Sequence, residues 1–418
     1  MIPTSSIVLT NEQQSALEAF FTFLADPKEV AFVLAGYSGT GKSTLVKTII
    51  DQMPVRQKVM ELLDPTYKGL DAVFTATTNK AAENLAFITG QSVVTIHSFL
   101  GLRVSRNYET GITELKPSYK KSMPEHHLVF VDEASSMDSA LLEHTFALTR
   151  NCKIVFIGDP AQLLGVKAST APVFNAGFPT AVLTQVVRQA EGNPIIDLAT
   201  KFRHTVNTGE FFSFKPDGIV IKHVQRQEFE TRLVEEFDRP DWNFRDSKVM
   251  GYTNACVTKY NQAINNLLKG TPHLRVGDYA ICNSFVKIDK HSIKTDQTVL
   301  ITRIDPEFAP NFVPGNNVTL DYLITAFLPK SRQDKQNRLK QAKAEKNYQL
   351  VEIIESEWID LRPAFASTID KAQGSTYDKV FIDLDDIRSC NSGDRIARMM
   401  YVGVSRARHQ VILTGDLA

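Results

Sequence analysis

The chain carries a glycine-rich segment whose residue types and spacing suit phosphate binding. An apolar run from Ala31 to Ala35 leads directly into Gly-Tyr-Ser-Gly-Thr-Gly-Lys-Ser-Thr at residues 36–44. Glycines let backbone N–H groups turn toward an anion, and a helix that starts here adds partial positive charge. The loop residues expected to hold a nucleoside triphosphate are Gly36, Ser38, Gly39, Thr40, Gly41, Lys42, Ser43 and Thr44.

Hydrolysis needs further groups beside this loop, and the sequence offers them. Lys42 can reach the β- and γ-phosphates, and the Ser43 hydroxyl can ligate Mg²⁺. Asp132 and Glu133 follow the apolar run 128–131, so they are expected at the ligand edge of a parallel sheet. Asp132 can hold Mg²⁺, and Glu133 can orient and activate the attacking water. The pair therefore predicts ATP hydrolysis and not binding alone.

Two glutamines leave their roles open. Gln162 follows the strand predicted at 153–157 and could touch the γ-phosphate, or it could be a solvated residue after an Asp-Pro turn. Gln13 lies at the start of an amphipathic helix, with Thr10 as its expected N-cap. It could offer its amide to an adenine edge, or it could be a surface residue.

Hydroxyl, amide and imidazole side chains stand at two further predicted helix starts. Thr78 and Asn79 follow a strand at 72–77, and Thr95 and His97 lie in the apolar segment 93–100. Such positions commonly bind phosphate oxygens. Ordinary N-caps explain either segment equally simply, and we favour that interpretation for each alone.

Arginines late in the chain are candidates for stabilising charge on a transferred phosphate. Arg188 could serve as an arginine finger or pair with a surface carboxylate. Arg406 and Arg408 lie two residues apart and so point differently. One can reach an ATP phosphate while the other makes a structural ion pair.

The pattern of apolar runs predicts which elements position these groups. Buried strands alternate with helices over most of the chain, as in a parallel α/β fold. Residues 101–117 alternate around a glycine-containing turn, which predicts an exposed β-hairpin. Residues 271–350 contain short alternating segments that predict a small antiparallel β-barrel. Within them, 329–346 is a basic run, for which a solvated helix or a loose arm is the default.

Composition limits the classes of partner and compartment. The chain has 47 Lys and Arg against 47 Asp and Glu, so a nucleic-acid site must be a local groove. The four cysteines show no metal-binding spacing, no apolar run is long enough for a membrane span, and no signal peptide is recognisable. We therefore expect a cytoplasmic protein that does not bind membranes.

Taken in order, the motifs resemble a superfamily 1 helicase of the 5′→3′ branch, and most closely the Dda-type bacteriophage helicases. The resemblance spans nearly the whole chain. The most specific stretches are ASTIDKAQG at 366–374, which is part of the segment 364–374, and YVGVSRAR at 401–408. The other matching stretches are ATTNKAA, TIHSFLG, VDEASSMD, IGDPAQL and LTQVVRQAEGNPIIDLA. The chain departs from the family at Asp370, where members often carry histidine, so no DNA-binding role is assigned to Asp370.

The resemblance implies two RecA-like P-loop motor domains with ATP and Mg²⁺ bound between them. The first would span 1–182 with a duplex-splitting pin at about 101–117. The second would span 183–270 and 351–418, with an SH3-like β-barrel inserted at 271–350. Gln13 would contact adenine, Gln162 would sense the γ-phosphate, and Arg188 and Arg406 would act across the cleft. Gly374 would join the nucleotide contacts, and Thr78, Asn79, Thr95, His97 and Thr368 would contact the DNA backbone.

The leading hypothesis is an ATP-dependent 5′→3′ DNA helicase, in phage-type DNA replication or recombination. Its expected partners are single-stranded DNA, forked duplex DNA and single-stranded-DNA-binding or replication proteins, and we expect a monomer in the cytoplasm, the host's if phage-encoded. A DNA-stimulated ATPase that displaces proteins without separating strands is the alternative, and RNA as substrate stays open. The polarity comes from the resemblance alone.

Overall fold

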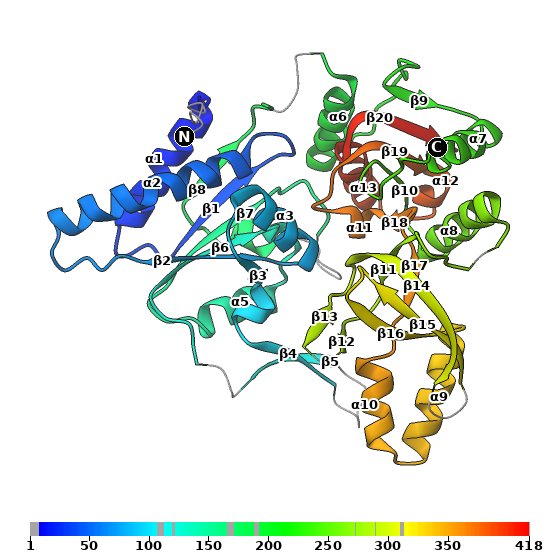
Figure 1. Cartoon of the computed structure of the whole chain (residues 1–418). Helices are drawn as coiled ribbons and strands as arrows, with labels where there is room; N and C mark the ends of the chain where they lie inside the picture. Colours follow the sequence, from blue (N-terminus) through cyan, green and yellow to red (C-terminus); the bar gives the residue numbers. More distant parts are fainter. Residues whose placement is uncertain are drawn as a thin grey trace. The chain divides into compact units, whose positions relative to one another are not determined.

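The computed structural model describes residues 8–106, 113–118, 122–164, 171–187, 192–271, 273–288, 290–309 and 313–417. The chain divides into two units (Figure 1). The first comprises the chain up to Asp197 together with 206–208, and the second comprises 198–205 and the chain from Gly209 onward. None of the described helices combines the length and the apolar character that crossing a bilayer requires.

The first unit is built on a six-stranded sheet in the order β3-β2-β6-β7-β1-β8, and every pairing in it is parallel. Its strands are β1 (Ala31–Gly36), β2 (Asp71–Ala76), β3 (Val93–Thr95), β6 (His127–Asp132), β7 (Lys153–Gly158) and β8 (Thr180–Leu183). Its helices are α1 (Asn11–Ala25), α2 (Lys42–Leu63), α3 (Asn79–Thr89), α4 (Ile96–Phe99) and α5 (Ser139–Ala147), with short 3₁₀ turns at Ala134–Ser136 and Pro172–Asn175.

Two apolar clusters hold this sheet, one for each set of alternating strand side chains. Phe20 of α1 packs in one cluster with Phe32 of β1 and Phe130 of β6, and all three are buried. The other contains Val33, from the same strand β1, and Leu141 of α5. Burial on both faces explains why these strands have continuous apolar runs and not an alternating pattern.

Strands β4 (Leu102–Arg106) and β5 (Thr113–Pro117) form a separate two-stranded antiparallel sheet. Its register pairs Leu102 with Pro117 and Arg106 with Thr113. The glycine-containing turn predicted between the strands, at 109–111, lies outside the described residues.

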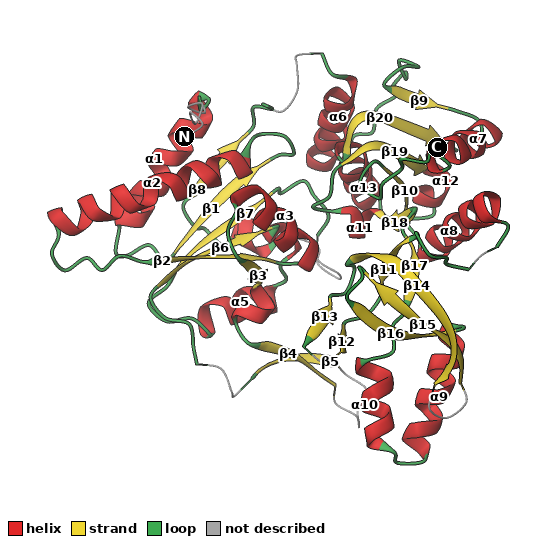
Figure 2. Ribbon diagram, viewed as in Figure 1, coloured by secondary structure: helices red, strands yellow, loops and turns green. Residues whose placement is uncertain are grey.

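The second unit contains a five-stranded sheet in the order β18-β10-β19-β20-β9, again with only parallel pairings (Figure 2). Its strands are β9 (Ile221–His223), β10 (Ser247–Gly251), β18 (Ala366–Thr368), β19 (Tyr377–Asp383) and β20 (Ala407–Thr414). The helices of this part are α7 (Arg226–Phe237), α8 (Asn254–Lys269), α11 (Ile369–Ala372), α12 (Leu384–Arg388) and α13 (Gly393–Ser405). The helix α6 (Pro194–Thr208) is divided between the two units, with residues 198–205 in the second. The prediction of two parallel α/β sheets is confirmed.

An antiparallel sheet is inserted between β10 and β18 in the order β16-β15-β14-β11-β17. Its strands are β11 (Tyr279–Cys282), β14 (Thr298–Ala309), β15 (Val313–Leu320), β16 (Ile324–Pro329) and β17 (Leu361–Pro363), beside a hairpin of β12 (Val286–Ile288) and β13 (His291–Ile293). The predicted insert ended at residue 350, whereas the ladder continues to Pro363 because β17 pairs with β11.

The basic run predicted as a solvated helix or a loose arm is the helix α9 (Arg332–Ala344), which packs against α10 (Tyr348–Ser356). Its solvation is incomplete. The Arg338 side chain is only 8% exposed, and Lys335 donates to the Trp358 carbonyl. Trp358 also lies against Phe327, with 4.9 Å between ring centroids. Apolar residues outside the run therefore fix this helix in place.

Candidate nucleotide and nucleic-acid sites

The glycine-rich loop joins β1 to α2 at the carboxyl edge of the first sheet. Gly39 and Gly41 have φ values of 81° and 80°, a left-handed conformation that glycine adopts without strain. Gly41 is the N-cap of α2, and a Cβ there would collide with the Gln13 side chain. The loop therefore needs glycine at this position for its backbone and for its neighbour.

Lys42 turns back into this loop. Its ammonium donates to the Gly36 carbonyl at 2.5 Å and to the Tyr37 carbonyl at 2.9 Å. Ser43 and Thr44 follow in the first turn of α2, where backbone N–H groups have no partner within the helix. Loop, lysine and helix start thus form one anion-binding geometry.

Gln13 is buried, with 3% of its surface exposed, so its interpretation as a surface residue is wrong. Its Oε1 accepts from the Thr10 backbone N–H at 3.0 Å, and Thr10 in turn caps the helix through Gln13 N. The other end of the amide donates to the Thr40 carbonyl at 3.1 Å. Gln13 therefore connects α1 to the phosphate loop, and adenine contact stays a prediction.

Asp132 and Glu133 lie at the same edge, at the end of β6. In the strand order β6-β7-β1, one strand, β7, lies between β6 and the strand that carries the loop. Burial, followed by the charge of Glu133, raises the pKa of Asp132 to about 7, and Lys42 opposes that shift. Glu133 has a left-handed φ of 54°, and its carbonyl accepts from the Thr77 and Ser136 hydroxyls.

Ser43 and Asp132, with Glu133 beside them, suit the binding of a divalent cation. A carboxylate withdrawn from water beside a second carboxylate is destabilised in its charged form, and a bound cation would relieve that cost. A hydroxyl and a carboxylate are also ligands that Mg²⁺ prefers. Ser43 and Asp132 would hold the ion, which would neutralise charge on the phosphates. Among the described residues, no group of three or more His, Cys, Asp and Glu forms a metal site.

The segment that follows β7, the strand between β6 and β1, contains Asp159 and Gln162. Both are buried, and the Gln162 amide lies 3.5 Å from the Asp159 carboxylate. The solvated-glutamine interpretation is therefore wrong, because Gln162 is 4% exposed. Three neighbouring strand ends thus contribute polar groups to one edge, although sensing of the γ-phosphate stays a prediction.

Two of the four residues of the first unit that are expected to contact the DNA backbone, Thr78 and Thr95, are helix N-caps. Thr78 accepts from Ala81 N at the start of α3, whose first residue is Asn79. Thr95 accepts from Ser98 N at the start of α4. Burial lowers the pKa of His97, with Asp138 opposing, so its imidazole is neutral at pH 7. The capping interpretation is correct for both threonines, and a hydroxyl that accepts from the backbone can still donate to a phosphate.

The second unit brings three candidates to its own sheet. Thr368 caps α11 by accepting from Lys371 N, and it is register partner to Gly251 at the end of β10. Gly374 follows with a φ of 75°. Arg406 is 6% exposed and donates to the carbonyls of Val402 and Ser375, both at 3.2 Å. Arg406 would have to exchange these bonds to reach a phosphate.

The structure reveals contacts that the sequence analysis missed. The Glu12 carboxylate accepts from Gln185 N and from the hydroxyl and N–H of Thr184, and these bonds hold its pKa below the ordinary range. Val187 N donates to the Gly39 carbonyl at 2.9 Å. Residues 183–187 thus lie on the phosphate loop, although the family resemblance places them in the second motor domain. No pattern within a short stretch of sequence indicates hydrogen bonds between residues more than 140 positions apart. Arg188 lies outside the described residues.

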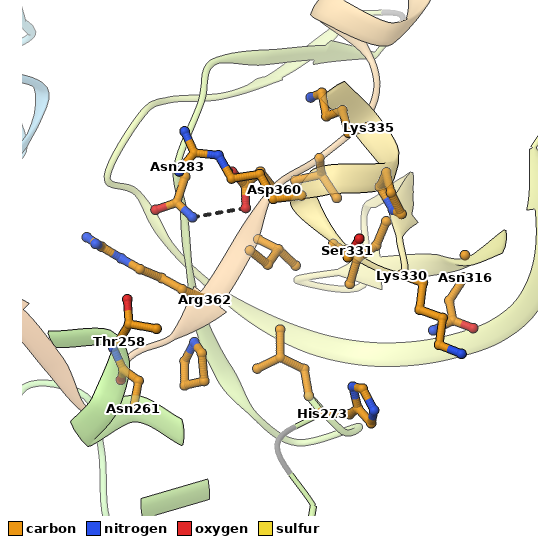
Figure 3. Close-up of a pocket in the computed structure, with 18 of the residues that line it drawn as sticks. Thr258, Asn261, His273, Asn283, Asn316, Lys330, Ser331, Lys335, Asp360 and Arg362 are labelled. Atoms are coloured by element: carbon orange, nitrogen blue, oxygen red, sulfur yellow. Dashed lines mark hydrogen bonds and ion pairs between the residues drawn. The ribbon is translucent and has the colours of Figure 1, made fainter. Parts of the chain in front are cut away.

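A cavity of about 1020 Å³ lies within the second unit, between α8 and the inserted sheet (Figure 3). Thr258 and Asn261 line it from α8, and Arg362 lines it from β17. Asn283 donates to Asp360 at 3.1 Å on its wall. Cationic side chains on its lining outnumber carboxylates; they are Lys330, Arg332, Lys335, Arg362 and Lys371. This is the local basic surface that a chain with no net charge needs to hold a polyanion.

Comparisons with known proteins agree with this architecture. Residues 8–222, more than half of the chain, match the family described as an AAA domain, and residues 363–414 match the UvrD-like helicase C-terminal domain. The ATP-dependent RecD2 DNA helicase of Deinococcus radiodurans is 34% identical over 198 residues. That match covers 47% of this chain and 24% of the relative, so the chain spans about a quarter of its length.

Two solved structures share the fold over nearly the whole chain. One concerns DNA unwinding at forked double-stranded DNA by two coordinating Pif1 helicases; it has a TM-score of 0.54 at 18% identity and covers 99% of this chain and 93% of that one. The other is Pif1 helicase from Bacteroides in complex with ADP-AlF3 and single-stranded DNA, with a TM-score of 0.52, 17% identity and the same coverage. Because the match at residues 8–222 covers more than half of the chain, the chain belongs to the AAA domain family.

Proposed function

We propose that this protein is an ATP-dependent DNA helicase that translocates 5′→3′ on single-stranded DNA and unwinds duplex DNA. The observation that carries the proposal is the single sheet edge shared by the phosphate loop, Asp132–Glu133 and Gln162. That edge combines a triphosphate cradle, a cation site and a carboxylate for activating water. The matches to helicase families link this ATPase chemistry to strand separation.

In the proposed cycle, Lys42 would bind the phosphates of ATP, and Arg188 and Arg406 would stabilise charge on the transferred phosphate. Ser43 and Asp132 would hold Mg²⁺, which would neutralise charge on the phosphates. ATP can drive a conformational change only if it binds one state of the protein more tightly than the other. Hydrolysis would reverse this change, so that the strand is alternately gripped and released. Thr78, Thr95 and Thr368 are the proposed gripping residues, since cap hydroxyls can still donate to phosphates.

The proposed substrates are single-stranded and forked DNA. The basic cavity of the second unit offers a route for a strand, because Lys371 of α11 lines it and lies three residues after Thr368. Backbone gripping would make binding salt-dependent and largely independent of base sequence. We further propose that the hairpin at 101–117 acts as a duplex-splitting pin, that the insert is an SH3-like barrel, and that the protein is a monomer. Its proposed role is Dda-like, in phage DNA replication or recombination, with contacts to single-stranded-DNA-binding or replication proteins.

Strand displacement on tailed duplexes tests the proposal. We expect unwinding of a duplex with a 5′ single-stranded tail, none with a 3′ tail, and a requirement for ATP and Mg²⁺. ATP turnover without unwinding of either substrate would contradict the helicase assignment and favour the alternative, a DNA-stimulated ATPase that displaces proteins.

Replacing residues 103–116 by a short Gly-Ser linker tests the pin. The β4–β5 ladder is a separate sheet, so its removal leaves the six-stranded sheet intact. We expect loss of unwinding with DNA-stimulated ATP turnover retained. Full unwinding by the shortened chain would contradict a pin at this position.

A further inference from the structure

An arginine, an aspartate and a tyrosine meet at the carboxyl edge of the second parallel sheet. Tyr252 directly follows β10, and Asp370 lies in α11, which follows β18. Gly251 at the end of β10 is the register partner of Thr368 at the end of β18, so Tyr252 and Asp370 follow the ends of two paired strands. The third member, Arg395, comes from the first turn of α13.

The contacts in this cluster fix the arginine from two sides. The Arg395 Nη2 donates to the Asp370 carboxylate at 3.2 Å. The guanidinium also lies over the Tyr252 ring, 5.4 Å from its centroid, a geometry in which the ring attracts the cation. A guanidinium carries five N–H donors, and the Arg395 side chain is 44% exposed. Donors therefore remain available to a ligand after the carboxylate is satisfied.

Electrostatics at this edge explain why the pair matters. An ionised Asp370 standing alone two residues after Thr368 would repel a phosphate. Its pairing with Arg395 cancels that charge, and arginine stays protonated at every physiological pH. The pair has no net charge, and the N–H donors of the guanidinium that Asp370 does not bind form a fork that matches phosphate oxygens.

We propose that Arg395 binds a backbone phosphate of the single strand beside Thr368, and that Asp370 and Tyr252 are positioning residues that orient its guanidinium. The inference rests on the proposed function, because it takes Thr368 as a strand contact. It also gives a role to the acid at position 370, whose carboxylate holds the donor and makes no DNA contact itself.

The same sheet contains a matched control. Arg408 donates to Asp378 at 3.1 Å, with side-chain exposures of 51% and 41%, close to the 44% and 37% of Arg395 and Asp370. This second pair lies near the amino ends of β19 and β20, at the opposite edge of the sheet. It is therefore an equivalent ion pair away from the proposed strand path.

Fluorescence anisotropy with a labelled oligothymidylate over a series of KCl concentrations, without nucleotide, tests the role of Arg395. A phosphate contact on a single strand contributes about 0.7 to the slope of log K against log salt. We expect Arg395→Ala to lower that slope by about 0.7 and to weaken binding about tenfold at low salt. Arg408→Ala should change neither, and Arg395→Lys should restore the slope because it restores the charge. An Arg395→Ala slope equal to that of Arg408→Ala, or failure of the lysine variant to restore the slope, would overturn the proposal.

Asp370→Asn, measured in two backgrounds, tests the positioning role. It should weaken binding in the unmodified chain, because the guanidinium loses its fixed orientation. In the Arg395→Ala background it should leave binding unchanged or strengthen it, because only a repulsive charge is removed. Equal strengthening in both backgrounds would overturn the positioning role.

The outcomes separate this inference from the proposed function. An unmodified chain that binds no single strand contradicts both. A chain that binds and unwinds DNA, but whose salt slope does not depend on Arg395, contradicts this inference alone.

Discussion

The side-chain amide of Gln13 donates a hydrogen bond to the backbone carbonyl of Thr40, at 3.1 Å. The same amide accepts from Thr10 N, so one buried side chain caps α1 and fixes the phosphate loop. A Cβ at Gly41 would collide with this side chain, which shows how closely helix and loop approach. The geometry of the nucleotide site therefore depends on a residue 27 positions before it.

Gln13→Ala should therefore impair ATP use without unfolding the chain. The change removes two side-chain hydrogen bonds; losing the buried one to the Thr40 carbonyl costs about 1 kcal/mol, and the loop would sample more conformations. We expect the KM for ATP to rise about five- to tenfold. Steady-state ATP turnover measures it. Gln14→Ala is the matched control, since Gln14 is exposed and its side chain donates to Glu18 on the same helix face. Equal KM values for the two variants would contradict the coupling.

Local signals predicted the phosphate loop, the acidic pair and the two parallel sheets. Each depends on neighbouring residues: an apolar run buries a strand, and the polar residues after it must lie at the sheet edge. Gly36 to Ser43 and Asp132–Glu133 lie where that logic places them. The threonine caps followed in the same way, because a cap is defined within four residues.

Long-range contacts were not predictable in this way. Glu12 bonds Thr184, and Arg395 bonds Asp370, and no spacing in the sequence signals either pair. The boundary of the insert was missed because β17 is only three residues long and pairs with β11 some eighty residues earlier. Arg338 was expected in a solvated segment, but neighbouring apolar residues from α10 and Trp358 give its helix a packing surface.

Lys42→Ala should abolish ATP turnover. The ammonium bonds the Gly36 and Tyr37 carbonyls, which places it inside the loop that would receive the phosphates. Removing such a fixed charge from a phosphoryl-transfer site typically costs 10² to 10³ in rate. Phosphate release should fall by at least about a hundredfold and unwinding should be lost. Lys47→Ala, an exposed lysine on the same helix, should retain turnover. Substantial turnover by the Lys42 variant would exclude a role in phosphate binding.

Glu133→Gln should separate binding from hydrolysis. The amide keeps the size of the side chain, so the left-handed backbone at this residue is undisturbed. It cannot accept a proton from water, and the loss of a general base costs about 10²–10⁴ in rate. A fluorescent ATP analogue should bind within about threefold of normal, and phosphate release should fall by at least about a hundredfold. Glu143→Gln, at an exposed position in α5, is the control. Rapid turnover by Glu133→Gln would assign water activation to another group.

Asp132→Asn should stabilise the nucleotide-free chain at alkaline pH. Burial and the charge of Glu133 raise the pKa of Asp132 to about 7, above its ordinary 3.8, so the folded state holds this proton more tightly than the unfolded state does. The stabilising effect of protonation is present at low pH and is lost progressively as the pH rises from 3.8 to about 7. The uncharged amide does not titrate, so the variant should lack this decline.

Thermal melting of both proteins between pH 5 and pH 8 measures the effect. We expect the variant's midpoint to exceed that of the unmodified chain by about 2 °C or more at pH 8, with a smaller gap at pH 5. Asp71→Asn, at an exposed carboxylate at the start of β2, should show no such divergence. The same Asp132 variant should lose Mg²⁺-dependent turnover, because the carboxylate that destabilises the empty fold is the one that would ligate the ion. Midpoints that stay parallel across this pH range would contradict a raised pKa at Asp132.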